Sequence, residues 1–346
     1  MEVLTVTNVN TALNAGINYL LSWGWGHSEE SRNGKVLVAP GPVCTVYRRP
    51  QERVLFSPTR DANPFFHLME SLWMLAGRND VAYPAQFNSR LSKYSDDGKT
   101  FYGAYGYRWR AAFGYDQLLE IIAELKKNPT SRRCVLSMWN GMAEFEAEDY
   151  GLKSDLRVAG AGGKDVPCNT HAYFDARGGA LNMTVCNRSN DAIWGAYGAN
   201  AVHFSFLQEY MADQIGVGVG EYRQFSNNLH IYTDIFDKKT LETMALEGRT
   251  LNLYDLYPDM KKIYLNSEVP GWDASLQEFI CSGRTDGRHG FFRDVAEPMY
   301  AAWFARKAGA VVEALDILKE MPYCDWQVAA LDWVKRREER KANNAA

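Results

Sequence analysis

Short strand-like segments alternate irregularly with amphipathic helical segments, and this alternation constrains the fold more than any other feature. Runs rich in β-branched and aromatic residues predict strands at 132–140, 171–176 and 180–186. Apolar residues at helical spacing predict helices at 11–22, 64–77, 116–127 and 201–215. Because these elements do not repeat as regular strand–helix units, the order predicts an α+β fold rather than a doubly wound parallel sheet.

Composition predicts one ordinary globular domain over the 346 residues. Apolar residues make up 46% and charged residues 23%, and no Pro/Gly/Ser tract separates the chain into blocks. The formal net charge of -4 provides no positive field for a nucleic-acid polymer. This charge remains compatible with a small anionic ligand held by a few local arginines.

The cysteine spacing indicates whether a metal site is expected, and the N-terminal sequence indicates the expected cellular compartment. The six cysteines contain no Cys-x-x-Cys pair, so we expect no metal site. The N-terminus has no basic region followed by an apolar core, and no apolar run is long enough to cross a bilayer. These features predict a soluble, cytoplasmic protein with reduced thiols.

A carboxylate lies on the apolar side of the helix predicted at 64–77. Asn63 and Pro64 form a start signal for this helix and Gly77 ends it. Glu70 is one turn away from Phe66 and Trp73, so its side chain is directed towards the core. It is either a structural carboxylate paired with an arginine or a group that handles protons.

Cys168 follows a loop and precedes a predicted strand, in the stretch DVPCNTHAYF. A lone cysteine is most often a packed core residue, whereas a nucleophilic thiol requires nearby positive charge. Arg132, Arg133, Arg188 and Ser189 come from neighbouring predicted strands. Their guanidinium and hydroxyl groups would suit a phosphate monoester.

Six segments, in this order, resemble motifs of the thymidylate synthase superfamily. They are ESLWMLAG at 70–77, YGYRW at 105–109, TSRRCVLSMWN at 130–140, PC at 167–168, NRSND at 187–191 and LHIY at 229–232. The segment at 105–109 resembles a Tyr-Gly-x-x-Trp loop of the family. The resemblance extends from about residue 30 to about residue 235. It implies one domain over 1–346 with a mixed β-sheet covered by helices, a sheet face at a homodimer interface, and a divergent helical region from about 236.

The resemblance implies covalent chemistry on a deoxypyrimidine monophosphate, with 5,10-methylenetetrahydrofolate as co-substrate. Cys168 would attack C6, Glu70 would manage protons through water, and Tyr105 would help to remove the C5 proton. Substrate contacts would come from Arg32, Arg188, Ser189, Asn200, His230 and Tyr232, and from Arg132 and Arg133 of a second subunit. Asp191 and Gly195 would contact the pterin.

Departures from the family pattern bear on the product. Asn169 replaces the histidine that usually follows the nucleophile, and the paired tryptophans are missing from NSRLSKYSDDG at 88–98. The chain ends in the polar sequence EERKANNAA instead of an apolar tail that would exclude water. Water would convert an exocyclic methylene into a hydroxymethyl group, so hydroxymethylation of dUMP is expected, as in phage relatives in the host cytoplasm. Methylation of dUMP and hydroxymethylation of dCMP are the alternatives.

Asn200 is the candidate for reading the base. An amide can both donate to and accept from uracil, whereas an aspartate would suit cytosine. The spacing from Asp191 is one residue longer than in the family pattern, and Asn200 could equally be a helix cap.

Two other classes remain open at this point. A cysteine hydrolase would use Cys168 with His171, His203 or His230 as base. A nonenzymatic nucleotide-binding protein would retain the arginines alone, and release of tritium from C5 of a labelled nucleotide would separate it from an enzyme.

Overall fold

A computed structural model describes residues 1–24, 28–141 and 154–345. A six-stranded sheet crosses it in the order β1 (Glu2–Val6), β4 (Val43–Tyr47), β9 (Gly218–Ser226), β7 (Ala180–Asn187), β6 (Asn169–Asp175), β5 (Val135–Ser137). β1 is parallel to β4 and β7 is parallel to β9, while the other pairs are antiparallel. The sheet is therefore mixed.

A smaller sheet lies beside the first and contains β2 (Ser28–Ser31), β3 (Gly34–Val38), β10 (Leu229–Tyr232) and β8 (Asn190–Asp191), in that order. β8 lies parallel to β10 and pairs Asp191 with His230. This short pairing brings two candidate site segments together.

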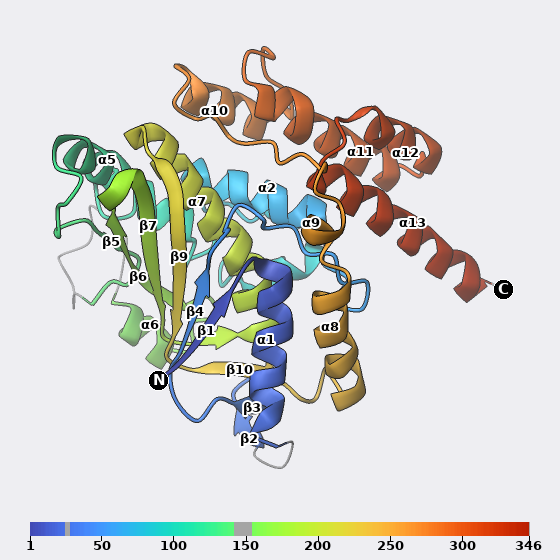
Figure 1. The fold of residues 1–346 in the computed structure, drawn as a ribbon, viewed down its shortest axis with the longest axis horizontal. Coiled ribbons are helices and arrows are strands. Elements are labelled where there is room, and N and C mark those ends of the chain that lie inside the picture. Colours follow the sequence, from blue (N-terminus) through green and yellow to red (C-terminus); the bar gives the residue numbers. More distant parts are fainter. Residues whose placement is uncertain (25–27, 142–153, 346) are drawn as a thin grey trace.

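The helices described before residue 216 are α1 (Val9–Ser22), α2 (Pro64–Leu75), α3 (Ala82–Ala85), α4 (Tyr105–Arg110), α5 (Gln117–Lys127), α6 (Asp155–Gly160) and α7 (Asn200–Ile215), with 3-10 turns at Ser89–Tyr94 and Arg177–Gly179. Among them, α1, α4, α5 and α7 contact the large sheet, and α2 packs on α7 (Figure 1). α7 packs against β7, β9 and α2. The site helices α2 and α7 thus share one buried layer.

The C-terminal region is helical, as the sequence predicts. It contains α8 (Lys238–Thr250), α9 (Leu253–Leu256), α10 (Trp272–Ser282), a π-helical turn at Phe292–Ala296, α11 (Glu297–Lys307), α12 (Val311–Glu320) and α13 (Asp325–Ala345). α10 to α13 gather at one end of the molecule (Figure 1). One apolar core cluster extends from Val6 to Val334. Within the described ranges, no helix is both long and apolar enough to span a membrane.

Three local predictions are wrong. The strand predicted at 132–140 is limited to Val135–Ser137, because the Arg133 N–H donates to the Ser131 hydroxyl instead of a neighbouring strand. The motif at 105–109 forms the short helix α4 instead of a loop. β7 ends at Asn187, so Arg188 and Ser189 lie in a turn rather than on the strand.

Asn200 does not cap α7, so that alternative is wrong as well. The cap position is Ala199, and no side chain makes a capping hydrogen bond there. A π-helix, Ala192–Ala199, runs directly into α7. A π-helical turn takes in one more residue than an α-turn, which is where the longer spacing between Asp191 and Asn200 is accommodated.

Candidate active site

Cys168 lies immediately before β6, and Arg188 fixes the loop that carries it. The Arg188 N–H donates to the Cys168 carbonyl at 2.9 Å. The Arg188 guanidinium donates through Nε to the Pro167 carbonyl at 2.8 Å and through Nη2 to the Val166 carbonyl at 3.0 Å. The cation predicted to hold a phosphate is therefore also the cation that shapes the nucleophile loop.

The charges around the Cys168 thiol oppose one another. Burial raises the pKa of Cys168, the positive charges of Arg188 and Arg32 lower it, and the carboxylate of Asp165 raises it, so that the pKa lies above its ordinary value. The thiol is thus protonated at neutral pH in the protein alone. Arg32, which lies in the turn between β2 and β3, is close enough to act on the thiol.

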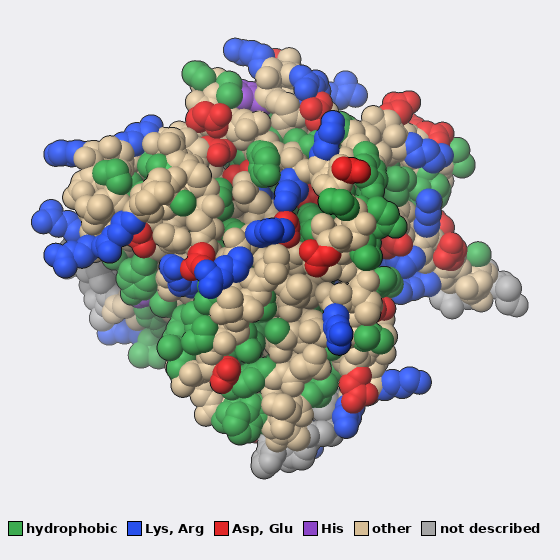
Figure 2. Space-filling view, viewed as in Figure 1, with side chains coloured by type: hydrophobic (Ala, Val, Ile, Leu, Met, Phe, Trp, Pro, Cys, Tyr) green, Lys and Arg blue, Asp and Glu red, His purple; other side chains and the backbone are tan. Residues whose placement is uncertain are grey.

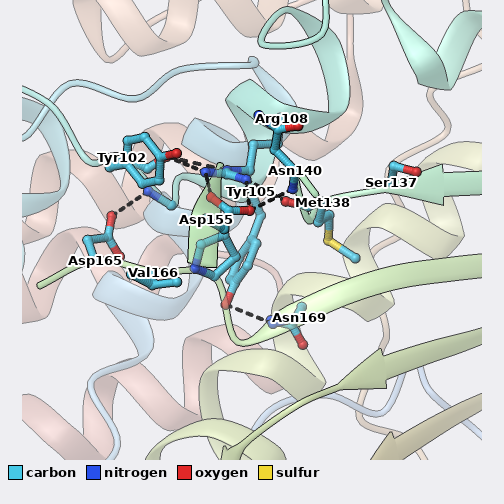
Figure 3. Close-up of polar contacts among 12 residues, drawn as sticks. Tyr102, Tyr105, Arg108, Ser137, Met138, Asn140, Asp155, Asp165, Val166 and Asn169 are labelled. Carbon is cyan, nitrogen blue, oxygen red and sulfur yellow. Dashed lines mark hydrogen bonds and ion pairs between the residues drawn. The ribbon is translucent and has the colours of Figure 1, made fainter. Parts of the chain in front are cut away.

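Tyr105 contacts the nucleophile loop from α4. Its hydroxyl accepts hydrogen bonds from the backbone N–H groups of Cys168 at 3.1 Å and Asn169 at 3.3 Å (Figure 3). Burial is the main cause of a pKa of Tyr105 well above its usual value, and the nearby Cys168 thiolate would raise it further. The phenol therefore keeps its proton and can donate it towards a ligand.

A buried ion pair holds α4 in place. Arg108 and Asp155 are fully buried and meet through two hydrogen bonds of 2.8 and 2.9 Å (Figure 3). Arg108 also donates to the Met138 carbonyl at 2.7 Å. Sequence reasoning missed this pair, because the two residues are far apart in the chain and nothing in the motif at 105–109 indicates which carboxylate Arg108 meets.

Asp165 is a second missed residue, three positions before the cysteine. Its carboxylate accepts from the Gly103 N–H at 2.8 Å. A side chain at residue 103 would place Cβ 2.9 Å from the Asp165 carbonyl oxygen, so glycine permits this close approach. Burial is the largest cause that raises the pKa of Asp165 to about 6.

Glu70 lies on α2 and faces a histidine on α7. Glu70 Oε2 is 3.0 Å from His203 Nε2, and the two side chains are 17% and 5% exposed. The prediction that helix packing directs Glu70 inward agrees with this position. Its partner within the described residues is a histidine and not an arginine.

Asn200 belongs to a chain of amides beneath the site. Its Nδ2 donates to Asn190 Oδ1 at 3.0 Å, and its Oδ1 accepts from Asn169 Nδ2 at 3.4 Å. Asn190 in turn donates to Gln224 and Ser226, both at 3.0 Å. Each amide can make more bonds than these, so Asn200 retains a donor and an acceptor for a ligand.

Asp191 presents a buried acceptor at the entrance to the π-helix. Its Oδ1 accepts from the Trp194 N–H at 2.5 Å, whereas its Oδ2 is buried without a hydrogen-bond partner among the described residues. Burial is the largest cause that raises the pKa of Asp191 to about 6, and the Arg60 guanidinium opposes it. An orphaned acceptor of this kind fits the N–H donors of a pterin.

The remaining candidates near Asp191 are Gly195 and two residues of β10, His230 and Tyr232. A Cβ at residue 195 would lie 2.7 Å from Asn190 Oδ1, so a larger residue would disturb the amide chain. His230 Nδ1 is 2.8 Å from Asn228 Oδ1, and its ring meets Tyr232 edge-on at 5.3 Å. The register of β8 with β10 places His230 beside Asp191.

Arg132 and Arg133 are not joined to Cys168 by any contact in the described structure. Both are exposed and precede the edge strand β5. Figure 2 shows Lys and Arg side chains at the edge of the molecule where Figure 1 places α5, whose last turn carries Lys126 and Lys127. The two arginines thus belong to a basic edge.

Metal chemistry and a cysteine–histidine pair find no support in the described geometry. Among the described residues, no group of three His, Cys, Asp or Glu side chains could hold a metal ion. His171 stacks on Tyr173 with ring centroids 6.5 Å apart, His203 contacts Glu70, and His230 contacts Asn228. No hydrogen bond or ion pair in the described parts joins any of them to Cys168.

Comparison with known proteins agrees with the motif order. The family model described as thymidylate synthase matches residues 51–265. A deoxyuridylate hydroxymethyltransferase of Pseudomonas phage M6 is 46% identical over 99% of this chain and 97% of its own length. Two further proteins of that name, from Bacillus phage SP01 and Delftia phage PhiW-14, are 36% and 28% identical over 60% and 68% of this chain, and over 54% and 64% of their own lengths. The chain belongs to the thymidylate synthase family.

Proposed function

We propose that this protein is a one-carbon transferase that converts dUMP to 5-hydroxymethyl-dUMP. The observation that carries the proposal is the similarity to the phage M6 deoxyuridylate hydroxymethyltransferase over nearly the whole of both chains. The family model ends at residue 265, whereas this similarity includes the helical region beyond it. The chain therefore shares with a hydroxymethyltransferase the very region that departs from the general family pattern.

Nucleotide binding would use the loop around Arg188. Arg188 and Ser189 would hold the phosphate together with Arg32, and the arriving phosphate dianion would neutralise cations that otherwise act on the thiol. His230 and Tyr232 would contact the ribose, and Asn200 would read the uracil edge with its free donor and acceptor. These contacts would place C6 of the base next to Cys168.

Covalent activation would begin when Cys168 Sγ bonds to C6 of the pyrimidine and C5 becomes enolate-like. Because the Cys168 thiol is protonated, the same step must remove its proton, and Glu70 would receive protons through ordered water. Tyr105, with two backbone N–H groups already bonded to its oxygen, would hold a water that takes the C5 proton. C5 would first bond to the one-carbon unit of methylenetetrahydrofolate, and loss of the C5 proton with departure of tetrahydrofolate would then leave an exocyclic methylene group on C5.

The co-substrate, 5,10-methylenetetrahydrofolate, would supply the one-carbon unit. Asp191 would bind it through the orphaned oxygen Oδ2, and Gly195 would leave room beside Asn190. Arg60 donates through Nε to the Ile193 carbonyl at 2.9 Å and so holds the segment that carries these residues. No metal is required by this arrangement.

Water, rather than a hydride, would complete the reaction. The C-terminal sequence forms the end of α13, where Arg336, Arg337 and Arg340 pair with Asp61 at 2.6 to 2.8 Å. These ion pairs would anchor a charged helix and not an apolar cover over the co-substrate. Without an apolar cover from this helix, water would be able to reach the methylene group, which is consistent with the hydroxymethyl product.

We include a homodimer and a cellular location in the same proposal. A second subunit would contribute Arg132 and Arg133 to the phosphate site, and the outer face of the six-stranded sheet would form the interface. Because the three hydroxymethyltransferase relatives are phage proteins, we place the reaction in the cytoplasm of an infected host.

Mass spectrometry of the product from dUMP or dCMP with methylenetetrahydrofolate tests the proposal. We expect a dUMP product heavier by one oxygen than dTMP, with tetrahydrofolate released, and no turnover by Cys168→Ala although it still binds dUMP. Methylation is the second candidate, favoured by the general family match. Formation of dTMP and dihydrofolate in equal amounts would establish it and refute hydroxymethylation.

A further inference from the structure

A buried histidine lies behind Glu70, and the steps proposed above do not use it. His203 is three residues after Asn200, one turn further along α7. His203 Nε2 is 3.0 Å from Glu70 Oε2, and the imidazole is more deeply buried than the carboxylate, with exposed fractions of 5% and 17%. Of this pair, the carboxylate is therefore the member that a ligand or water can approach.

Among the described residues, the contact with Glu70 is the polar contact found for His203 Nε2. Within the described residues Nε2 has no hydrogen-bond partner, since the contact with Glu70 has the distance of an ion pair without the alignment of a hydrogen bond. A buried ring nitrogen without a hydrogen bond is unfavourable, and a small rotation of either side chain would align the two groups for one. The two groups are thus placed to share one proton.

The titratable groups around this pair come from three segments. His67, on α2, meets the His203 ring edge-on at 6.5 Å, and its pKa is far below the ordinary value because of burial first and then the charges of Arg60 and His203. Asp165 adds a carboxylate that interacts with Glu70, while Arg60, near Asp191, adds a cation. Because His67 stays neutral, the charged groups named here among the described residues are the Arg60 cation and the Asp165 carboxylate.

We propose that His203 is a positioning residue that acts through Glu70 in the water-addition step. It holds the carboxylate in place and takes a proton from it, so that Glu70 remains available as a base. This inference rests on the proposed hydroxymethylation, because only that reaction requires a water molecule to lose a proton at the methylene group.

The step balances without a further reactant. The water oxygen bonds to the methylene carbon, the electrons of that double bond move to C5, and one water proton passes to Glu70 and on to His203 Nε2. The C5 electrons then re-form the C5=C6 bond and expel the Cys168 thiolate from C6. The net change is addition of hydroxide to the methylene carbon, with the water proton on His203 and Cys168 returned as the thiolate.

A double-mutant cycle between His203→Gln and Glu70→Gln tests the inference. If His203 acts through Glu70, His203→Gln lowers kcat about 10- to 100-fold with little change in KM for dUMP, and the double variant is no slower than Glu70→Gln alone. His171→Gln is the matched control, because that histidine lies on β6 away from Glu70. Wild-type kcat in His203→Gln, or losses that multiply in the double variant, would overturn the inference.

NMR spectroscopy of the imidazole groups provides a test that does not depend on the folding of His203→Gln. We expect Glu70→Gln to shift the imidazole NMR signals of His203 and to leave those of His171 unchanged, because the Glu70 carboxylate lies 3.0 Å from His203 Nε2. An unchanged His203 would overturn the inference. The product of the unmutated enzyme is measured separately, so dTMP formation would refute the proposed function, whereas 5-hydroxymethyl-dUMP with an uncoupled His203 would refute the inference alone.

Discussion

Tyr105 and Cys168 are joined by a hydrogen bond from the cysteine N–H to the tyrosine hydroxyl, at 3.1 Å. This bond links α4 directly to the nucleophile loop. Asp165 makes a second link three residues earlier through the Gly103 N–H. Together they fix the distance between the phenol and the thiol before any ligand binds.

Tyr105→Phe should separate chemistry from binding. The change removes the acceptor for two backbone N–H groups and the hydroxyl that would hold water near C5. We expect kcat to fall about 10- to 100-fold, with a similar fall in tritium release from C5 and a nearly unchanged Kd for dUMP. Tyr107→Phe, on the same helix, is the control and should retain activity; equal rates in the two variants would contradict the role of Tyr105.

Asp155→Ala should destabilise the protein strongly. It leaves the fully buried guanidinium of Arg108 without its carboxylate, which costs about 3–5 kcal/mol of the free energy of unfolding. Asp316→Ala, which breaks the exposed pair with Lys319, should cost less than about 1 kcal/mol. Urea denaturation of both variants measures the difference, and similar midpoints would contradict it.

Local signals were sufficient for the elements that carry the main candidates. Asn63 caps α2 through its side chain and Pro64 occupies the first turn, as predicted, so Glu70 could be placed on a buried helix face. Cys168 does lie at the junction of a loop and a strand. These features depend on residues close together in the chain, which is why the sequence pattern contains them.

Contacts between distant segments could not be predicted in the same way. The Arg108–Asp155 pair joins α4 to α6, and the Glu70–His203 contact joins α2 to α7. Charge or amphipathic spacing does not specify which buried partner a side chain meets. His203 even follows the apolar pattern of α7, so only the packing of α7 on α2 reveals it.

Stability should fall as pH rises from about 4 to about 7. Burial raises the folded-state pKa of both Asp165 and Asp191 from 3.8 to about 6, so the folded protein binds more protons than the unfolded chain in that window. Each shift corresponds to at most about 3 kcal/mol in the free energy of unfolding. Asp191→Asn should flatten this fall, whereas Asp237→Asn, at the exposed start of α8, should not; chemical denaturation across the pH range measures both slopes.

Asn200→Asp should move the base preference towards cytosine. The carboxylate loses the N–H that bonds to Asn190 Oδ1 and gains an acceptor for the cytosine amino group. We expect the ratio of kcat/KM for dCMP to that for dUMP to rise at least about 10-fold. Asn200→Ala should lose dUMP activity without this gain, and efficient dCMP turnover by the unmutated protein would contradict the base assignment.

Mixing two inactive variants should restore activity if subunits share their sites. Arg132 and Arg133 are exposed beside an edge strand, and the outer sheet face next to them exposes Val135 and Tyr173 to 40% and 46%. Such a face is suited to a symmetric dimer, in which each subunit would lend its arginines to the partner's Cys168.

The expected recovery follows from counting sites. Random exchange of Cys168→Ala with Arg132→Ala/Arg133→Ala makes about half the dimers mixed, and each mixed dimer has one site with both an intact thiol and intact arginines, so roughly a quarter of all sites recover. Native mass spectrometry would verify that mixed dimers form, and a product assay would measure activity. Stable mixed dimers without activity would show that each subunit's arginines serve its own site or none, because only a shared site can be rebuilt by mixing.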